Sequence, residues 1–229
     1  MRRAAGIVAI SQATARALTE RFPRAAGKVT VAPLGVSPAL DVRDVAESLP
    51  AAGFVLAVGT LEPRKNLPRL AAAYGSLPAA LKKRHPLVIA GEIGWQAGPS
   101  TAALDALDAG AIRLGYVSDA ALAELYRRCA VFCYPSLGEG FGLPVLEAMA
   151  AGATVLTSSV SSLPEVGADA VAYCDPQQVD SIGQALKELL DDAPRRALLS
   201  ERARARSLEF SWERTAELVL AALEGAARR

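Results

Sequence analysis

Six short runs of apolar residues recur along the chain from residue 54 onwards, and segments with helical spacing separate them. The runs lie at 54–58, 87–90, 112–116, 131–134, 154–157 and 171–174. Continuous apolar runs of this length are typical of parallel strands buried on both faces. Between them, Leu67, Leu70, Ala71 and Tyr74 fall on one helical face. This alternation predicts an α/β fold, a Rossmann-like doubly wound parallel sheet of about six strands with helices on both faces.

Polar residues indicate where the predicted helices begin and end. Asn66, Ser100 and Ser118 are expected to be N-caps, because their side-chain oxygens can accept hydrogen bonds from the free N–H groups of a first helical turn. Gly110 is expected to stop a helix, because glycine readily adopts the left-handed backbone that ends one. Residues 37–50 contain prolines and acidic residues and are expected to form a surface connection.

The two ends of the chain lie outside this regular alternation. Residues 6–10 are predicted to form a buried strand, Ser11 to cap a helix that runs to about Phe22, and residues 28–32 to be extended. Ser211 is expected to cap a final helix with an apolar side. The segment before it carries Arg195, Arg196, Arg202, Arg204 and Arg206. Such a face is usually solvated, and contact with an anionic membrane surface is the alternative.

Composition removes several functional classes. The chain has 229 residues, 52% of them hydrophobic, and a net charge of +1, which argues against a nucleic-acid binder held by its overall charge. Cys129, Cys133 and Cys174 have no CxxC spacing, and His85 is the single histidine, so we expect reduced thiols and no zinc site. Without a signal peptide or a long apolar run, a cytoplasmic location with at most peripheral membrane contact is expected.

The most informative stretch lies at 137–152, where a glycine-rich loop joins an apolar strand to a helix that Pro144 opens and Gly152 ends. The free N–H groups of such a loop and helix N-terminus favour an anion such as phosphate. Glu139 and Glu147 bracket that spot, and carboxylates accept hydrogen bonds from hydroxyls. The combination predicts a site for a sugar joined to a phosphate. A strand–helix turn whose glycines only permit tight packing is the alternative.

A second loop, at 59–66, follows the first predicted strand of the sheet. It contains one glycine, Gly59, whereas a dinucleotide fingerprint needs three at fixed spacing, so an NAD-dependent oxidoreductase is disfavoured. Arg64 and Lys65 can instead stabilise a departing diphosphate. Because the sequence contains no Asp-x-Asp pair, we expect a metal-independent reaction with no cofactor. An ordinary basic turn is the alternative, and the expected position opposite Glu139 favours the functional reading.

Residues 139–150 resemble the Glu-x7-Glu signature of the retaining glycosyltransferases of family 4, which have the GT-B fold. Residues 58–66 resemble the donor-phosphate loop of the same family. The resemblance runs from about Gly6 to the C-terminus and implies the C-terminal, donor-binding half of such an enzyme. On that basis residues 1–36 are the remnant of an N-terminal domain and a link, residues 37–210 bind the nucleotide sugar, and residues 211–229 form a crossover helix.

The resemblance also implies roles for individual residues. Glu139 would contact the donor sugar, Arg64 and Lys65 would stabilise the leaving diphosphate, and Glu147 would contact the ribose. A retaining transfer can proceed by double displacement with a carboxylate nucleophile or by front-face attack, and the resemblance implies the second. The remaining implied substrate-binding residues act largely through backbone groups: Gly59, Gly140, Phe141, Gly142 and Leu143 at the phosphates and sugar, and Tyr116 and Val117 at the base. A core position is the alternative for Tyr116. Gly91, Glu92 and Gly94 would border the pocket, although an ordinary loop acid is the favoured reading for Glu92, and His85 is assigned no role.

The function implied is transfer of a hexose, mannose from GDP-mannose, onto a glycan or lipid-linked acceptor. The run at 60–66 looks most like bacterial mannosyltransferases, and UDP- or dTDP-sugars remain open as donors. The second partner implied is the missing N-terminal GT-B domain, and this half alone is expected to be inactive. The alternative from another class is a non-catalytic module that binds a nucleotide or nucleotide sugar.

Overall fold

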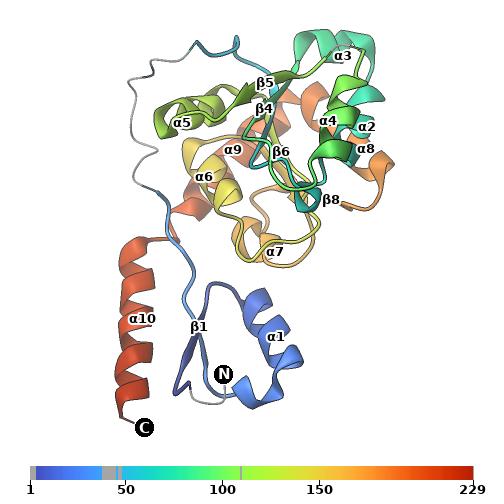
Figure 1. Cartoon of the computed structure of the whole chain (residues 1–229). Helices are drawn as coiled ribbons and strands as arrows, with labels where there is room; N and C mark the ends of the chain where they lie inside the picture. The colour runs from blue at the N-terminus through green and yellow to red at the C-terminus, as the bar shows by residue number, and fades with distance from the viewer. Residues whose placement is uncertain (1–3, 38–44, 46–47, 109, 229) are drawn as a thin grey trace.

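A computed structural model describes residues 4–37, 45, 48–108 and 110–228 of the chain (Figure 1). Two parallel sheets are present among them, one of two strands and one of six. The small sheet pairs β1 (Ile7–Ala9) with β2 (Val29–Val31) and carries α1 (Gln12–Arg21) and η1 (Pro23–Ala25). The surface connection predicted at 37–50 lies mostly outside the described residues.

The six-stranded sheet confirms the predicted α/β fold. Its spatial order is β5-β4-β3-β6-β7-β8, with all neighbours parallel. The bounds are Val55–Val58 for β3, Leu87–Ala90 for β4, Ile112–Gly115 for β5, Val131–Tyr134 for β6, Val155–Ser158 for β7 and Ala172–Cys174 for β8. The chain winds outward from β3 to β5 and then returns to β6 beside β3. The loops at the carboxyl ends of β3 and β6 therefore lie next to each other at a topological switch point, where open α/β sheets bind ligands.

Helices cover both faces of this sheet because side chains alternate along each strand. On β3, Val55 and Ala57 belong to one core and Leu56 belongs to the other, which also contains Phe54 directly before the strand. The first core packs against α2 (Leu67–Gly75), α4 (Gly98–Asp105) and α8 (Val179–Asp191). The second packs against α5 (Asp119–Arg128), α6 (Leu143–Ala151) and α7 (Leu163–Gly167). The helices η3 (Pro63–Lys65), α3 (Ala79–Arg84) and α9 (Ala193–Ser207) complete this part of the chain.

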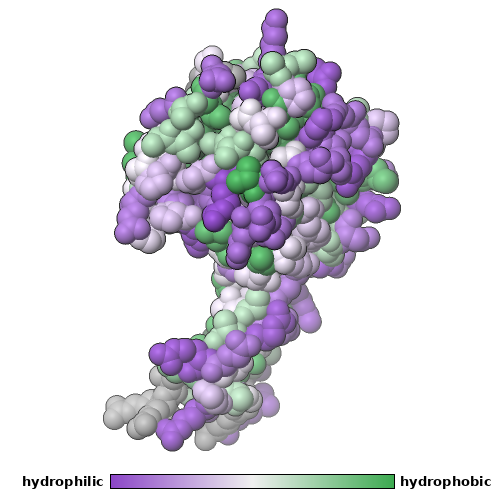
Figure 2. Space-filling model, turned by 90° about the vertical axis from the view of Figure 1, so that its right-hand side faces the viewer, coloured by the Kyte–Doolittle hydropathy of each residue, from purple (hydrophilic) through white to green (hydrophobic). Residues whose placement is uncertain are grey.

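The last helix, α10 (Trp212–Ala227), returns to the small sheet and contacts β1 and β2. Ser211 caps it as predicted, accepting a hydrogen bond from the N–H of Arg214, and the Thr215 hydroxyl donates to the carbonyl of Pro33 at 2.5 Å. Ser11 likewise caps α1. Leu220 and Leu223 of α10 are exposed. Figure 2 shows a broad body built on the six-stranded sheet and a narrower part below it, with hydrophilic residues over much of the visible face.

Three of the predicted helix boundaries need correction. Ser118 does cap α5, but α4 begins at Gly98 with a proline in its first turn, which places Ser100 inside the helix. Helix α4 then ends at Asp105, so Gly110 lies in the turn that follows rather than at the stop. Asn66 occupies the cap position of α2 without capping it. Its side-chain amide instead donates to the carbonyls of Pro135 and Pro176, at 3.0 and 2.7 Å.

Two expectations about exposure were wrong. Strand β5 is not buried on both faces, since it lies at the sheet edge and Ile112 is 41% exposed. The arginine-rich helix α9 is not simply solvated. Arg196 donates to the carbonyls of Leu189 and Leu190 at the end of α8, and Arg204 and Arg206 donate to carbonyls at Ala151 of α6 and Glu165 of α7. These side chains supply hydrogen bonds to carbonyls of neighbouring helices.

The predicted state of the cysteines agrees with the structure. Cys133 and Cys174 are buried, Cys129 is partly buried, and all three are free thiols. Burial raises the pKa of Cys129 and of Cys174 to about 12, so both carry their proton at neutral pH. Within the described part of the chain, no helix combines the length and the apolar character needed to cross a membrane.

Candidate functional site

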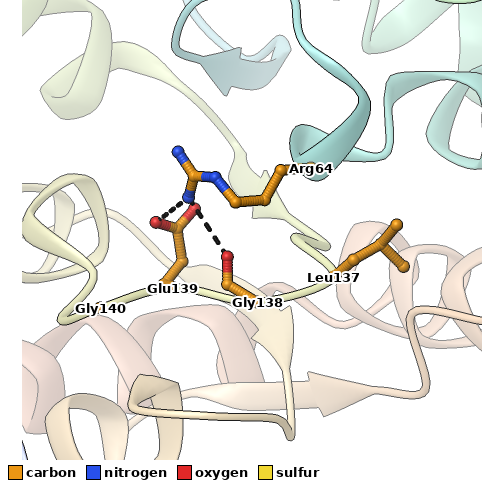
Figure 3. Close-up of a pocket in the computed structure, with 5 residues that line it drawn as sticks. All are labelled: Arg64, Leu137, Gly138, Glu139 and Gly140. Carbon is orange, nitrogen blue, oxygen red and sulfur yellow. Dashed lines mark hydrogen bonds and ion pairs between the residues drawn. The ribbon is translucent and has the colours of Figure 1, made fainter. Parts of the chain in front are cut away.

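Two loops meet at the switch point between β3 and β6. The loop after β3 continues into η3, and the loop after β6 leads into α6. The N–H of Leu137 donates to the carbonyl of Arg64 at 2.9 Å and joins them. Between the loops lies an open cavity of about 620 Å³, lined by Arg64, Leu137, Gly138, Glu139 and Gly140 (Figure 3). The structure thus brings together the two loops that the sequence singled out.

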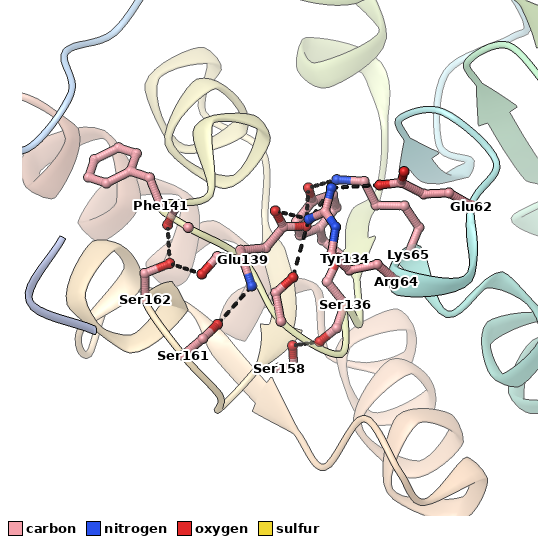
Figure 4. Close-up of polar contacts among 12 residues, drawn as sticks. Glu62, Arg64, Lys65, Tyr134, Ser136, Glu139, Phe141, Ser158, Ser161 and Ser162 are labelled. Carbon is pink, nitrogen blue, oxygen red and sulfur yellow. Dashed lines mark hydrogen bonds and ion pairs between the residues drawn. The ribbon is translucent and has the colours of Figure 1, made fainter. Parts of the chain in front are cut away.

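Glu139 is the centre of the polar contacts in this cavity (Figure 4). Lys65 Nζ lies 2.9 Å from Glu139 Oε1, and the Tyr134 hydroxyl donates to the same oxygen at 2.7 Å. The Arg64 guanidinium pairs with the other carboxylate oxygen and also reaches Glu62 at 2.6 Å. The side chains of Glu139 and Lys65 are 9% and 11% exposed, whereas that of Arg64 is 43% exposed. One carboxylate therefore holds two cations at the edge of solvent.

The electrostatics of this cluster favour an ionised Glu139. Burial opposes its charge, but the Lys65 ammonium and the hydrogen bonds from Lys65 and Tyr134 outweigh burial and lower the pKa of Glu139. Burial lowers the pKa of Lys65, and Glu139 opposes that shift. For Arg64, burial is likewise opposed by Glu139, and the net effect raises the pKa of the guanidinium. A ligand that carries negative charge can therefore replace Glu139 as the partner of these two cations.

Side chains behind the glycine-rich loop hold its carbonyl groups. The Ser162 hydroxyl lies 2.9 Å from the carbonyl of Glu139 and 2.8 Å from that of Phe141 (Figure 4). The hydroxyls of Ser11 and Thr14 donate to the carbonyl of Gly140, at 2.7 and 2.9 Å. Each carbonyl from Glu139 to Phe141 therefore lies within hydrogen-bond distance of a side-chain hydroxyl.

Several backbone N–H groups of the same loop have no acceptor among the described residues. Those of residues 140–143 donate to no atom of the described residues. Leu143, rather than Pro144 as predicted, is the first residue of α6, so its N–H adds to the row. Gly142 has φ of 107°, and a side chain there would lie 2.7 Å from Leu163. A row of N–H groups at a helix N-terminus is suited to an anion or to hydroxyl oxygens.

The second carboxylate, Glu147, lies on α6 and is partly buried. The Tyr126 hydroxyl donates to its Oε2 at 3.3 Å. Burial raises the pKa of Glu147, and this hydrogen bond only partly opposes the shift. A partly buried carboxylate with one weak donor has capacity to accept further hydrogen bonds from ligand hydroxyls.

A second, smaller cavity of about 150 Å³ lies near the ends of β4 and β5. Gly91, Glu92 and Gly115 line it, together with Leu61, Ile89, Ile93 and Arg113. Gly91 approaches Gly59 so closely that a Cβ there would lie 2.2 Å from the Gly59 carbonyl oxygen. Tyr116 and Val117 follow β5, and Tyr116 is 75% exposed, which removes the alternative that it belongs to the core. The glycines that border the site thus permit close backbone contact.

His85 has a structural role. It precedes β4, at the amino end of the sheet, and its Nδ1 lies 2.5 Å from the carbonyl of Gly53. The site cavities lie at the carboxyl ends of the strands. Among the described residues there is also no group of three side chains that could hold a metal ion.

Sequence reasoning missed the residues that support the loop. Tyr134 was identified only as part of a strand. Because it is the last residue of β6, its hydroxyl lies at the carboxyl end of the sheet, next to the cavity. Ser161 accepts a hydrogen bond from the N–H of Glu139 at 2.9 Å, and Ser162 holds the neighbouring carbonyls. The serines after β7 were the available signal, because small hydroxyl residues at a strand end often satisfy loop backbone groups.

Comparison with known proteins relates this chain to one group of enzymes. Residues 44–206 match the family described as glycosyl transferases group 1. The O-antigen chain mannosyltransferase B of Escherichia coli is 37% identical over 217 residues, which cover 90% of this chain and 57% of that protein. The serotype-specific mannosyltransferase WbdA of Escherichia coli is 36% identical over 247 residues, covering 99% of this chain and 29% of that protein. The chain thus spans little more than half of the first relative and less of the second.

Solved structures show the same fold at low sequence identity. The HepE protein of Anabaena, solved with UDP and glucose, superimposes with a TM-score of 0.82 at 19% identity over 97% of this chain and 64% of that one. Sucrose-phosphate synthase from Thermosynechococcus elongatus gives 0.80 at 24% identity over 97% and 58% of the two chains. These likenesses concern the fold and confirm the expected C-terminal part of a GT-B architecture.

Proposed function

Because this chain belongs to the glycosyl transferases of group 1, we propose that it is the donor-binding half of a retaining hexosyltransferase. The donor is GDP-mannose, the acceptor is a glycan or a lipid-linked glycan, and an N-terminal GT-B domain supplies the acceptor side. The observation that carries the proposal is the cluster in which Arg64 and Lys65 hold Glu139 beside the N–H groups of residues 140–143, which have no acceptor among the described residues. Each part of this cluster matches one part of a nucleotide sugar.

The diphosphate is assigned to Arg64, Lys65 and the N-terminus of α6. Arg64 and Lys65 both pair with the single carboxylate of Glu139, which leaves positive charge for a further anion. A diphosphate can pair with both cations and accept hydrogen bonds from the N–H groups of residues 140–143. The negative charge that develops on the diphosphate as the sugar–phosphate bond breaks is then stabilised without a metal. Arg64 offers a fork of donors at the solvent edge, whereas Lys65 offers a buried point charge.

The sugar is assigned to Glu139. Once the diphosphate holds the cations, the carboxylate is free to accept hydrogen bonds from two sugar hydroxyls and so to orient the donor. Transfer with retention then proceeds by front-face attack, with the leaving phosphate taking the proton of the acceptor. Glu139 orients the donor in this scheme and is not a nucleophile.

The choice of GDP-mannose is supported by the relatives and by the smaller cavity. Both sequence relatives described above are named mannosyltransferases. Glu92 lines the cavity near the end of β5, which this proposal assigns to the base. A guanine edge offers a ring N–H and an amino group to a carboxylate, whereas uracil offers one N–H. UDP-sugars remain the competing donors, because the HepE structure was solved with UDP and glucose.

Calorimetric titration of this chain without added metal tests the proposal. The ligands are GDP, GDP-mannose, UDP, UDP-glucose and NAD. We expect GDP and GDP-mannose to bind at least about tenfold more tightly than the uridine ligands, since one unsatisfied polar contact in a site costs about 1–3 kcal/mol. NAD is expected not to bind. Preference for the uridine ligands would show that the donor is a UDP-sugar and not GDP-mannose. A folded chain that binds none of the five ligands would contradict the proposed site.

Protonation of Glu147 should weaken nucleotide binding at mildly acid pH. Ribose hydroxyls donate to the ionised carboxylate, so binding favours the charged form and lowers the raised pKa of Glu147. Affinity should therefore be highest above that pKa and should fall as the pH approaches it from above, before ordinary glutamates titrate at about 4.3. Titrations with GDP across this range test the sign. Glu147→Gln should bind GDP more weakly at neutral pH and lose this pH dependence, and a dependence that persists would contradict the ribose contact.

A further inference from the structure

Helix α1, which follows the first strand of the small sheet, is capped by a carboxylate from the six-stranded part of the chain. Glu165 of α7 accepts hydrogen bonds from the N–H groups of Gln12 and Ala13, each at 2.7 Å, one on each carboxylate oxygen. Arg16 lies 3.3 Å from the same carboxylate. Glu165 thereby satisfies two of the free N–H groups of the first turn of α1 and lies at the positive end of the helix.

The residue that begins α1 also contacts the glycine-rich loop. Ser11 is buried, and its oxygen accepts a hydrogen bond from the N–H of Thr14, so its own hydrogen is available to the Gly140 carbonyl. Thr14 donates to the same carbonyl. In a planar trans peptide the C=O and the following N–H point in opposite directions. Fixing the Gly140 carbonyl towards α1 therefore turns the N–H of Phe141 away from α1.

Helix α7 links these two sets of contacts. Ser162, directly before α7, holds the carbonyls of Glu139 and Phe141, while Glu165 caps α1. The Arg206 guanidinium of α9 donates to the backbone carbonyl of Glu165 at 2.9 Å and holds this turn in place. The glycine-rich loop is thus held from two sides, by Ser162 of the same domain and by the hydroxyls of α1.

We propose that Glu165 is a positioning residue that docks α1 on the glycine-rich loop, where Ser11 and Thr14 orient the Gly140–Phe141 peptide for the donor. Glu165 itself does not touch the ligand. The inference rests on the proposed function in one respect, namely that the N–H of Phe141 serves a nucleotide sugar. Docking of α1 and donor affinity are then linked. Loss of the Glu165 cap therefore weakens the binding of a ligand that Glu165 does not contact.

Glu165→Gln tests the proposal, because an amide has one acceptor oxygen and cannot accept both N–H groups in the same way. We expect amide exchange at Gln12 and Ala13 to quicken, the NMR signal of the Phe141 amide to shift, and GDP-mannose affinity to fall by about threefold to thirtyfold, the size of one lost N-cap. The matched control is Asp192→Asn. It removes a carboxylate that caps α9 at 2.8 Å, and it should leave GDP-mannose affinity unchanged.

A double-mutant cycle distinguishes positioning from a general loss of stability. Replacing Ser11 by alanine together with Thr14 by valine should lower affinity by a similar factor, and adding Glu165→Gln should cost little more, since all three act through one peptide. Fully additive losses, or faster exchange at Gln12 and Ala13 with unchanged affinity, would overturn the proposal. Absence of nucleotide-sugar binding by the unmodified chain would instead contradict the proposed function, and the Phe141 signal would still report whether α1 orients the loop.

Discussion

Replacing Lys65 by methionine should weaken GDP binding by about tenfold to a hundredfold and leave the fold intact. The ammonium group is the buried cation of the site, and a hydrogen bond to a charged group contributes about 1.5–3 kcal/mol. Methionine keeps most of the apolar stem, which passes over Gly59, where a Cβ would lie 3.1 Å from Lys65 Cε. Glu139 keeps its pairing with Arg64, so the variant does not leave a buried carboxylate without a partner. Calorimetric titration with GDP gives the change directly.

The matched control for this variant is Lys187→Met. Lys187 also pairs with a carboxylate, Asp191 at 2.7 Å, but both side chains are exposed on α8. An exposed pair of this kind contributes little to stability, and Lys187 does not line the site. GDP affinity should therefore be unchanged in the control. A folded Lys65→Met protein that binds GDP as tightly as the unmodified chain would remove Lys65 from the phosphate site.

Much of the fold could be predicted because burial on both faces of a parallel sheet leaves a clear pattern. Strand β3 shows why, since Val55 and Leu56 face different cores and both must be apolar. The same pattern could not separate a central strand from an edge strand, so the exposure of Ile112 on β5 was missed. Ser100 was misplaced for a local reason, because a proline in the first turn let α4 begin earlier than a serine cap would require.

The candidate site could be predicted only in part. Glu139, Arg64 and Lys65 could be identified because their loops follow predicted strands, and open parallel sheets bind ligands at the carboxyl ends of their strands. Their direct pairing was not visible, since 74 residues separate Glu139 from Lys65 and only the sheet order brings them together. The support from Ser11 is still more remote, at 129 residues from Gly140. Such contacts depend on tertiary packing, and no local spacing in the sequence encodes them.

The Glu139→Gln variant should separate the two ligands of the site. Neutralising the carboxylate frees Arg64 and Lys65 for phosphate, so GDP should bind about twofold to fivefold more tightly, in the range of one relieved ion pair. GDP-mannose should not share this gain, because its sugar loses a charge-assisted acceptor contributing about 1.5–3 kcal/mol. The preference for GDP-mannose over GDP should therefore fall by at least about tenfold in paired titrations.

The pH dependence of stability gives a second measure of the same pairing. The folded-state pKa of Glu139 is lowered, so its ion pairs stabilise the fold above the unfolded-state pKa, and this contribution is lost as the pH falls through the folded value. The melting temperature of Glu139→Gln should therefore fall less on acidification than that of the unmodified chain, as thermal unfolding across pH measures.

Glu62→Gln is the matched control for Glu139→Gln, because Glu62 also pairs with Arg64, at 2.6 Å, from the other side of the guanidinium. Removing the ion pair between Arg64 and Glu62 should change the affinities for GDP and GDP-mannose by the same factor, since Glu62 has no assigned contact with the sugar. If Glu139→Gln likewise shifted both ligands equally, Glu139 would act only as a counter-ion for the two cations. Selective loss of GDP-mannose affinity in Glu139→Gln alone is the result that a carboxylate holding the sugar requires.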